Sequence, residues 1–491
     1  MRILFLSSEV MPFAKTGGLA DVAGALPIEL TRIGHEIIVV MPRYKKVDIN
    51  KYKLKQVVTD INVKVGDKNI TGAAYIGKIP NSRTKIYFIE NNDLFEREGL
   101  YGTNECEYKD YKDNSERFIF YSKAALELCK KLDWSPDIVH CNDWQTGVVP
   151  LLLKTLYKND PLFKNSKSLF TIHNLAYQGI FDKEVIEQIG VSWDYFSFDK
   201  LEFWGKLSFL KGALIYADAI NTVSIRYSKE IQTEEYGAGL DGVLQDRKKD
   251  LYGILNGIDY NFFNPMKDPN LHNNYNSRTL YHKEGNKEFL LRQLGLKYKK
   301  GVPLVSMITR LADQKGFDIF SEIAEKLFSL DIQLVVLGTG MDKYHKLLLK
   351  LEMEYPQKMK ALLSYDPVLA QQIYAGSDIF LMPSHYEPCG LGQLISLKYG
   401  TIPVVRETGG LADTIVDFDL ARDFEQDRGN GFTFSEYSSK NFFNTIIRSL
   451  KVYKDKNAWS KIQANAMKAD FSWKVSARTY ENLYKKISEK N

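Results

Sequence analysis

A glycine-containing loop near the start of the chain has the composition of a phosphate-binding loop. Lys15, Thr16, Gly17 and Gly18 follow a short apolar segment and precede a stretch with helical spacing of apolar residues. Paired glycines let the backbone approach a ligand closely, and the free N–H groups at a helix N-terminus favour an anion. The Lys15 ammonium adds a positive charge, so the loop suits a diphosphate. It matches neither the GxGxxG pattern nor the GxxxxGK[ST] pattern.

Two further cations follow an apolar segment in the second half of the chain. Segment 304–308 predicts a buried strand, and Arg310 and Lys315 come directly after it. Open α/β sheets bind ligands at the carboxyl ends of their strands. Arg can hold phosphate oxygens with two N–H groups, and Lys supplies a compact charge. The pattern leaves two interpretations open, a phosphate contact and a solvated surface pair.

A carboxylate follows the strand predicted at 379–382. Glu387 lies in the segment PSHYEPCGL (383–391), in which Gly390 and Leu391 lead into a helical stretch. The carboxylate can accept hydrogen bonds from hydroxyls while the backbone N–H groups donate, which suits a polyhydroxylated ligand. The alternative is that Glu387 only places a favourable negative charge at a helix start.

Two histidines and an aspartate lie at predicted strand ends in the first half. His140 lies near the end of segment 137–141, Asp143 follows that segment, and His173 ends segment 168–173. A single histidine is more often a structural residue than a catalyst. Asp143 and His173 are nevertheless better placed than average, because strand ends of one sheet converge on its binding edge.

The sequence predicts neither a metal nor another cofactor. No group of His, Cys and Asp residues has metal-ligand spacing. Asp417-Phe418-Asp419 has the DxD pattern of metal-dependent sugar transferases, but it follows a predicted helix and not a strand. We therefore expect Asp417 and Asp419 to form a solvated pair.

Two series of alternating strands and helices must position these residues. Apolar runs predict strands at 3–6, 36–41, 137–141, 168–173 and 219–224, then at 304–308, 334–337, 379–382 and 402–405. Helical spacing predicts helices at 21–34, 204–217 and 472–490. The pattern is that of two doubly wound α/β domains. We predict boundaries at 1–255 and 256–470, with 471–491 as a C-terminal helix.

One six-residue segment occurs twice. Residues 16–21 read TGGLAD, and residues 408–413 repeat them in the other half of the chain. Both copies lie between a predicted strand and a predicted helix. They indicate either two ligand-facing loops, one in each domain, or a shared way of packing a tight turn before a helix.

Composition excludes several classes of function. The 491 residues carry a net charge of +5, which is too small to indicate a nucleic-acid partner. The apolar run at the N-terminus is too short for a signal peptide, and no segment is long enough to span a membrane. The four cysteines form no CxxC pair, which favours reduced thiols and a cytoplasmic location.

These segments together resemble those of the bacterial glycogen synthases and plant soluble starch synthases. The resemblance extends over nearly the whole chain. It rests on segments 15–21, 140–147, 171–179, 256–259, 309–316, 387–393 and 408–413, and on the terminal FSW at 471–473. It implies the GT-B fold, in which two Rossmann-like domains face a cleft and the C-terminal helix returns to the first domain.

The resemblance also implies roles for individual residues. Lys15 and the Gly18 backbone would bind the donor phosphates, and Arg310 and Lys315 would neutralise the diphosphate leaving group. Glu387 would bind the transferred glucose. Residues implied nearer the sugar or the acceptor are His173, Asp143, Asn256, Tyr101 and Trp144. Ile395 stands where many related retaining transferases carry a second Glu, and Gly392 stands where many family members have Thr.

The activity that the resemblance implies is retaining transfer of glucose from ADP-glucose to the non-reducing end of an α-1,4-glucan. The predicted partners are therefore ADP-glucose and the glucan, without nucleic acid, membrane or a particular oligomeric state. Two alternatives remain: the same fold using UDP-glucose or a small acceptor, and a catalytically inactive glucan-binding protein. Matched charges and water exclusion can stabilise a departing diphosphate without a metal.

Overall fold

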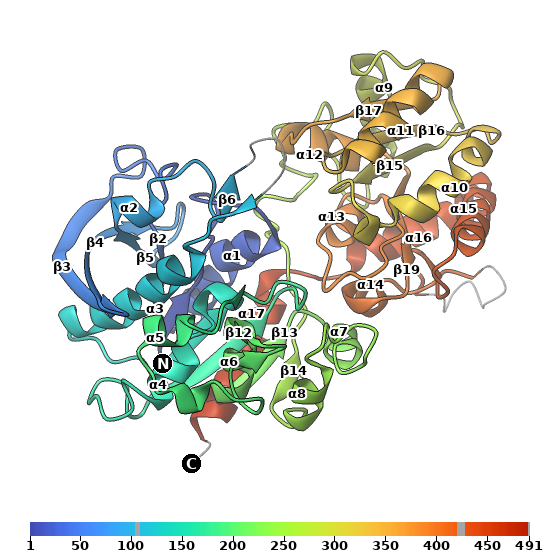
Figure 1. Ribbon diagram of the computed structural model, residues 1–491. Coiled ribbons are helices and arrows are strands. Elements are labelled where there is room, and N and C mark those ends of the chain that lie inside the picture. Colours follow the sequence, from blue (N-terminus) through green and yellow to red (C-terminus); the bar gives the residue numbers. More distant parts are fainter. Residues whose placement is uncertain (104–108, 420–427, 490–491) are drawn as a thin grey trace. The chain divides into compact units, whose positions relative to one another are not determined.

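The computed structural model of the chain describes residues 1–103, 109–419 and 428–489. It consists of two compact units (Figure 1). Unit 1 comprises Met1–Ile254 and Trp473–Asn491, and unit 2 comprises Leu255–Ser472. Each unit is built around its own β-sheet, so each positions its own set of candidate residues.

The sheet of unit 1 has nine strands within the described residues, in the order β14-β13-β9-β8-β1-β2-β5-β4-β3. The strands from β14 to β5 are parallel to one another, whereas β4 pairs antiparallel with both β5 and β3. β1 lies between β8 and β2, with Leu4 opposite Val139 and Ile38. The bounds are β1 Arg2–Leu6, β2 Glu36–Pro42, β3 Lys55–Val65, β4 Lys68–Lys78, β5 Lys85–Glu90, β8 Ile138–Asn142, β9 Lys167–Ile172, β13 Ala219–Thr222 and β14 Leu251–Gly253.

Helices cover this sheet in two packed groups. The C-terminal helix α17 packs against α1 and β9, whereas α3 lies along β2 to β5 and contacts α4 and α5. Apolar residues at helical spacing in α1, among them Val22, Leu26 and Leu30, are fully buried. The bounds are α1 Gly18–Arg32, α2 Asn92–Phe95, α3 Asn114–Lys131, α4 Val149–Lys154, α5 Val185–Ile189, α6 Phe209–Tyr216, α7 Ile225–Glu230, α8 Asp241–Asp246 and α17 Trp473–Ser488.

The predicted helix at 204–217 is wrong in its first part. The helix α6 begins only at Phe209, because the Ser208 side chain accepts a hydrogen bond from the Lys211 N–H and caps it. The residues before it form the hairpin of β11 (Glu202–Phe203) and β12 (Lys206–Ser208). Trp204 and Gly205 at its tip both have positive φ, so they form a turn. β12 also pairs with β10 (Ile180–Phe181).

The sheet of unit 2 has six parallel strands among the residues that the structure describes, in the order β17-β16-β15-β18-β19-β20. Their bounds are β15 Leu304–Ile308, β16 Gln333–Leu337, β17 Met359–Leu362, β18 Ile379–Met382, β19 Ile402–Arg406 and β20 Phe432–Phe434. The helices are α9 Lys283–Gln293, α10 Phe317–Phe328, α11 Asp342–Glu354, α12 Pro367–Gly376, α13 Gly392–Lys398, α14 Gly409–Thr414, α15 Ser439–Lys454 and α16 Lys456–Lys468. α10 packs on α15 and α9 packs on α12.

Two further observations concern the chain as a whole. No helix within the described ranges is long and apolar enough to cross a membrane. Cys129, Cys141 and Cys389 are buried free thiols, and Cys106 lies outside the described residues.

Candidate functional site

The candidate residues of unit 1 lie at the point where the strand order of its sheet reverses. From β1 the chain continues to β2 on one side, and β8 and β9 later add to the other side. Loops at the carboxyl ends of such neighbouring strands diverge and leave a crevice for a ligand. The loop after β1 carries Lys15, the turn after β8 carries Asp143, and His173 follows β9 directly. The fold therefore brings these three loops to one edge of the sheet.

The Lys15 loop ends at the first turn of α1, which begins at Gly18, three residues before the predicted start. The Lys15 ammonium is partly exposed and lies 2.7 Å from the carboxylate of Asp21, which belongs to the first turn of α1. Burial raises the pKa of Asp21, although the neighbouring Lys15 charge acts in the opposite direction. The ion pair holds the Lys15 side chain beside the helix N-terminus.

Sequence reasoning missed Glu9, which the structure places in the same loop. Its carboxylate accepts hydrogen bonds from the backbone N–H groups of Thr16 and Gly17 and from the Tyr101 hydroxyl. Glu9 is buried, with only 3% of its surface exposed. The pattern of a single Glu in a loop carries no spacing signal, so only the three-dimensional contacts could reveal it.

One hydrogen bond joins His173 to Asp143, and a second joins the His173 ring to Asn142. The His173 backbone N–H donates to Asp143 Oδ1 at 2.8 Å, and His173 Nε2 lies 2.9 Å from Asn142 Oδ1. Burial lowers the pKa of His173 to about 3, so its imidazole is neutral near pH 7. Because Asn142 Oδ1 can only accept, Nε2 carries the proton and Nδ1 remains as the acceptor of the ring.

The backbone of Asp143 is unusual. Its φ of 54° lies in the left-handed region, which residues other than glycine rarely adopt. Burial, reinforced by the negative charge of Glu9, raises the pKa of Asp143 to about 7, against hydrogen bonds from the His173 and Asn174 N–H groups. A strained residue with a pKa near neutrality at a sheet edge is typical of functional positions.

The two predicted aromatic residues differ in their surroundings. The Tyr101 ring is partly buried, and its hydroxyl lies 2.8 Å from Ser8 Oγ and 2.7 Å from Glu9 Oε1. Trp144 is only 8% exposed, and its ring packs against Phe118 and Phe181. The aromatic core around Trp144 thus connects the Asp143 turn to the Tyr101 segment.

The candidate residues of unit 2 also lie at a reversal of strand order. β15 is flanked by β16 on one side and by β18 on the other. The loop after β15 carries Arg310 and Lys315, and the loop after β18 carries Glu387. Arg310 is exposed, and its guanidinium lies 3.3 Å from Gln314 Oε1.

Lys315 and Glu387 form a nearly buried ion pair. Lys315 Nζ lies 2.6 Å from Glu387 Oε2, and the two side chains are 14% and 8% exposed. Ser384 Oγ donates to the same Oε2 atom at 3.1 Å. The two loops also touch through Gly316, whose φ is 79°, because a Cβ there would lie 2.1 Å from the Pro383 carbonyl oxygen. Only glycine permits this approach, which brings Lys315 onto Glu387.

The second copy of the repeated segment packs against the backbone of the Glu387 loop. Gly410 N donates to the Glu387 carbonyl oxygen at 3.1 Å. A Cβ at Gly409 would lie 1.9 Å from that oxygen, whereas a Cβ at Gly17 in the first copy would meet nothing within 4 Å. The two copies therefore serve different purposes: close backbone packing in unit 2, and an open turn before α1 in unit 1.

The remaining predicted residues of unit 2 surround the same loop. Gly390 has a φ of 72° and Leu391 precedes α13. The Asn256 N–H donates to Cys389 Sγ, and the buried Asn256 Oδ1 has no partner among the described residues. Gly392 has no hydroxyl to offer where many family members have Thr, and a Cβ there would lie 3.1 Å from the Phe380 ring.

The prediction that Asp417 is a solvated residue is wrong. Both of its carboxylate oxygens bind the Arg448 guanidinium at 2.6 Å, and Oδ1 also accepts from the Thr433 N–H. The ion pair ties the segment after α14 to α15 and β20. No group of three or more His, Cys, Asp or Glu residues that could hold a metal ion occurs in the part of the chain that the structure describes.

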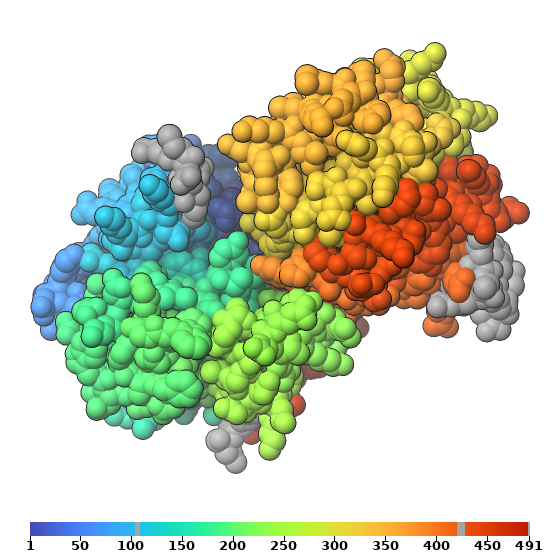
Figure 2. All heavy atoms as spheres, turned by 45° about the vertical axis from the view of Figure 1, so that its right-hand side comes forward, coloured from blue at the N-terminus to red at the C-terminus, as the bar shows by residue number. Residues whose placement is uncertain are grey.

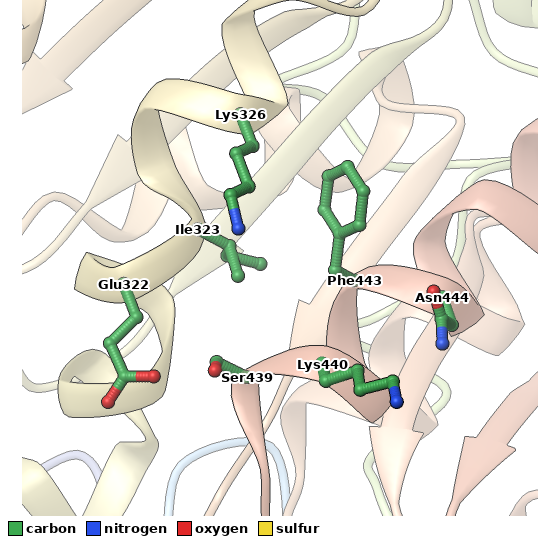
Figure 3. A pocket seen from close by; sticks show the side chains of 7 residues that line it. All are labelled: Glu322, Ile323, Lys326, Ser439, Lys440, Phe443 and Asn444. Atoms are coloured by element: carbon green, nitrogen blue, oxygen red, sulfur yellow. The ribbon is translucent and has the colours of Figure 1, made fainter.

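A separate groove of about 240 Å³ lies between α10 and α15 of unit 2. In Figure 2 the yellow atoms of α10 border the orange-red atoms of α15. Figure 3 shows residues of α10 facing residues of α15 across it; the lining residues are Glu322, Ile323, Lys326, Ser439, Lys440, Phe443 and Asn444. None of them belongs to the loops after β15 and β18, so this groove is distinct from the candidate site.

Comparisons with protein families match both halves of the chain. The family described as "Starch synthase catalytic domain" matches residues 2–246, and "Glycosyl transferases group 1" matches residues 292–466. The glycogen synthase of Desulforudis audaxviator is 47% identical over all of this chain and 97% of its own length. That of Thermotoga maritima is 45% identical over all of this chain and 99% of its own length.

Solved structures give the same picture. The catalytic domain of starch synthase IV from Arabidopsis thaliana, bound to ADP and acarbose, has a TM-score of 0.91 and 33% identity, with 99% of each chain covered. Sucrose-phosphate synthase from Thermosynechococcus elongatus has a TM-score of 0.59 at 17% identity, which shows a shared fold only.

Proposed function

Because this chain belongs to the glycogen and starch synthase family and is a glucosyltransferase of glycogen synthesis, we propose that its donor is ADP-glucose and its acceptor the non-reducing end of an α-1,4-glucan. Its fold is the predicted GT-B class. The starch synthase IV structure, which holds ADP and acarbose, supports this choice of substrates. The product keeps the α-configuration of the donor.

Three cations neutralise the leaving group. Cleavage of the glucosyl–phosphate bond puts negative charge on the departing diphosphate of ADP. Lys15 in unit 1 and Arg310 and Lys315 in unit 2 supply positive charge for it. The free N–H groups at the start of α1 add partial positive charge. Such preorganised charges stabilise a transition state without rearranging during the reaction.

Glu387 binds the transferred glucose. Its Oε2 atom is held by Lys315 and Ser384, whereas Oε1 receives no hydrogen bond from the residues that the structure describes. Oε1 therefore accepts from a hydroxyl of the glucose. The Lys315–Glu387 pair carries this assignment, since one short contact joins the group that holds the sugar to the group that neutralises the leaving phosphate.

His173 acts near the reacting carbon and the C6 hydroxyl of the transferred glucose, and Asp143 acts on the side of the acceptor. The neutral His173 ring offers Nδ1 as an acceptor, and the His173 backbone N–H donates to the Asp143 side chain. In the transfer, the bond from glucose C1 to the diphosphate oxygen breaks, and a bond from C1 to the acceptor oxygen forms on the same face. The hydroxyl proton passes to the departing diphosphate, so no pair of carboxylates at glycosidase spacing is required.

We also propose a cytoplasmic location for the enzyme. Glycogen synthesis and the buried free thiols of Cys129, Cys141 and Cys389 support a cytoplasmic enzyme.

A coupled assay of nucleoside diphosphate release tests the proposal. Purified protein is incubated with ADP-glucose or UDP-glucose, each with and without glycogen. We expect release of ADP that depends on glycogen and a much lower rate with UDP-glucose. A preference for UDP-glucose, or release that a small sugar but not glycogen supports, would contradict the assigned substrates. Binding of glycogen without any release would instead indicate an inactive glucan-binding protein.

A further inference from the structure

One buried carboxylate of unit 1 gathers an unusual number of hydrogen bonds. Glu9 Oε2 accepts from the Thr16 N–H and, at 3.2 Å, from the Gly17 N–H. Glu9 Oε1 accepts from Thr16 Oγ1 at 2.5 Å and from the Tyr101 hydroxyl at 2.7 Å. Tyr101 is 92 residues away in the sequence. One side chain therefore joins the loop before α1 to a distant segment of the same unit.

These contacts determine which donors remain for a ligand. The first N–H groups of a helix have no partner inside the helix. Glu9 occupies those of Thr16 and Gly17, just before the helix. The N–H groups of Gly18 and Leu19 have no partner among the described residues. These two N–H groups therefore remain available to an anion at this turn, near Lys15.

We propose that Glu9 is a positioning residue of the donor site, whose carboxylate fixes the Lys15–Gly18 turn and the Tyr101 hydroxyl in the orientation that the reaction needs. The inference rests on the proposed role of Lys15 at the donor phosphates. Glu9 itself does not bind the diphosphate, because both groups are negatively charged and it already takes the two N–H groups of the turn.

The chemistry of a carboxylate explains why glutamate stands here. Burying a negative charge is costly unless several donors compensate it. Four donors do so, two on each oxygen, and hydrogen bonds to an ionised acceptor are stronger than those between neutral groups. A neutral glutamine has one oxygen in place of two, and its NH₂ group would face the N–H groups of the turn. The negative charge of Glu9 also contributes to raising the pKa values of Asp143 and Tyr101, after burial.

The test compares substitutions of Glu9 with a matched control. Glu9→Gln keeps the size of the side chain but removes one acceptor oxygen. Glu29→Gln, on the surface of α1 where Glu29 pairs with Arg32, is the control. Because Glu9→Gln could fail to fold, Thr16→Val is a second probe at an exposed residue, with Thr16→Ser as the conservative variant that retains the hydroxyl donor. Thermal unfolding and the kinetics of ADP release are measured for every variant.

We expect Glu9→Gln to lower kcat/KM for ADP-glucose by roughly 10- to 100-fold, because a displacement of about 1 Å can cost that much. Thr16→Val should lower it by a smaller factor, which Thr16→Ser largely restores, and Glu29→Gln should have no effect. Because three of the four hydrogen bonds of Glu9 hold the Lys15 loop and one holds Tyr101, the KM for glycogen should change less than kcat/KM for ADP-glucose.

A double variant separates positioning from a general effect on folding. If Glu9 acts through the Lys15 turn, Glu9→Gln should cost less than about 3-fold in a Lys15→Gln background, because coupled sites are not additive. Equal factors in both backgrounds, or wild-type kinetics in both Glu9→Gln and Thr16→Val, would overturn the inference. If Lys15→Gln alone left kcat/KM for ADP-glucose unchanged, the proposed role of Lys15 itself would be wrong. The Lys15→Gln variant is therefore measured before the Glu9 variants.

Discussion

Replacing Lys315 by methionine tests the ion pair on which the donor site depends. Lys315→Met keeps an unbranched side chain of similar length but removes its charge. Among the described residues, the Glu387 carboxylate then keeps only the Ser384 hydroxyl as a partner, and the residue is 6% exposed. The substitution should therefore affect both the stability of unit 2 and the transfer reaction, and the two effects have different physical causes.

The size of each effect follows from the geometry. Removing one partner of a buried ion pair costs about 3 to 5 kcal/mol, because the other charge remains buried without compensation. For a unit of this size, Tm should fall by roughly 6 to 20 °C. Loss of a charge that stabilises the leaving group costs about 3 to 4 kcal/mol in the transition state, or roughly 100- to 1000-fold in kcat/KM.

The double variant Lys315→Met/Glu387→Gln distinguishes these effects. It removes both charges, so Tm should return close to that of the wild type. Its kcat/KM should stay low, because neither the glucose contact nor the phosphate charge is restored. ADP release is measured at 25 °C, below the unfolding temperature of every variant. Recovery of activity together with Tm, or a single variant with lowered Tm but unchanged kcat/KM, would refute a catalytic role for the pair.

Four further outcomes are expected. Lys15→Gln should lower kcat/KM for ADP-glucose by roughly 100- to 1000-fold, and an unchanged value in the ADP-release assay would contradict its role. Dialysis against a chelator should leave most of the activity; a loss that Mn²⁺ restores would bring Asp417 back as a metal ligand. In the wild type, the unfolding free energy should fall as the pH rises from 3.8 to about 7, because the folded protein keeps a proton on Asp143 that the unfolded chain has lost. Asp143→Asn should abolish this fall, which urea unfolding at about pH 5 and about pH 8 measures. Tyr484→Phe removes a 2.8 Å hydrogen bond to the buried His140, so thermal unfolding should show a loss of about 1 to 2 kcal/mol, and an unchanged Tm would contradict this.

The strands that the sequence predicted are short apolar runs that are mostly buried, whereas β3 and β4, which have many exposed residues, were not predicted. The predicted strands at 304–308 and 379–382 agree with β15 and β18 at both ends. The helix predicted at 204–217 failed at its start, since Lys206–Ser208 pairs with two neighbouring strands instead. Cross-strand pairing depends on partners elsewhere in the chain, so local periodicity does not reveal it.

The candidate site shows the same division. The positions of Lys315 and Glu387 after two strands indicated chemistry at a sheet edge, but nothing in the sequence showed that their side chains touch across 72 residues. Asp417 looked solvated because its partner, Arg448, is 31 residues away on α15. Glu9 had no motif at all: three of its hydrogen bonds form within its own folded loop, and the fourth comes from Tyr101, 92 residues away.

The sequence by itself determined the kind of protein: two α/β halves, the order of the loops that carry charge, and the resemblance to a family of glucosyltransferases. These properties depend on residue type and on local spacing, which the chain carries along its length. Only the tertiary structure decided which charges are paired, that the buried His140 and His173 are neutral, and which carboxylate organises the turn before α1. Pairing, burial and pKa depend on atoms that are distant in sequence and adjacent in space, and folding alone brings them together.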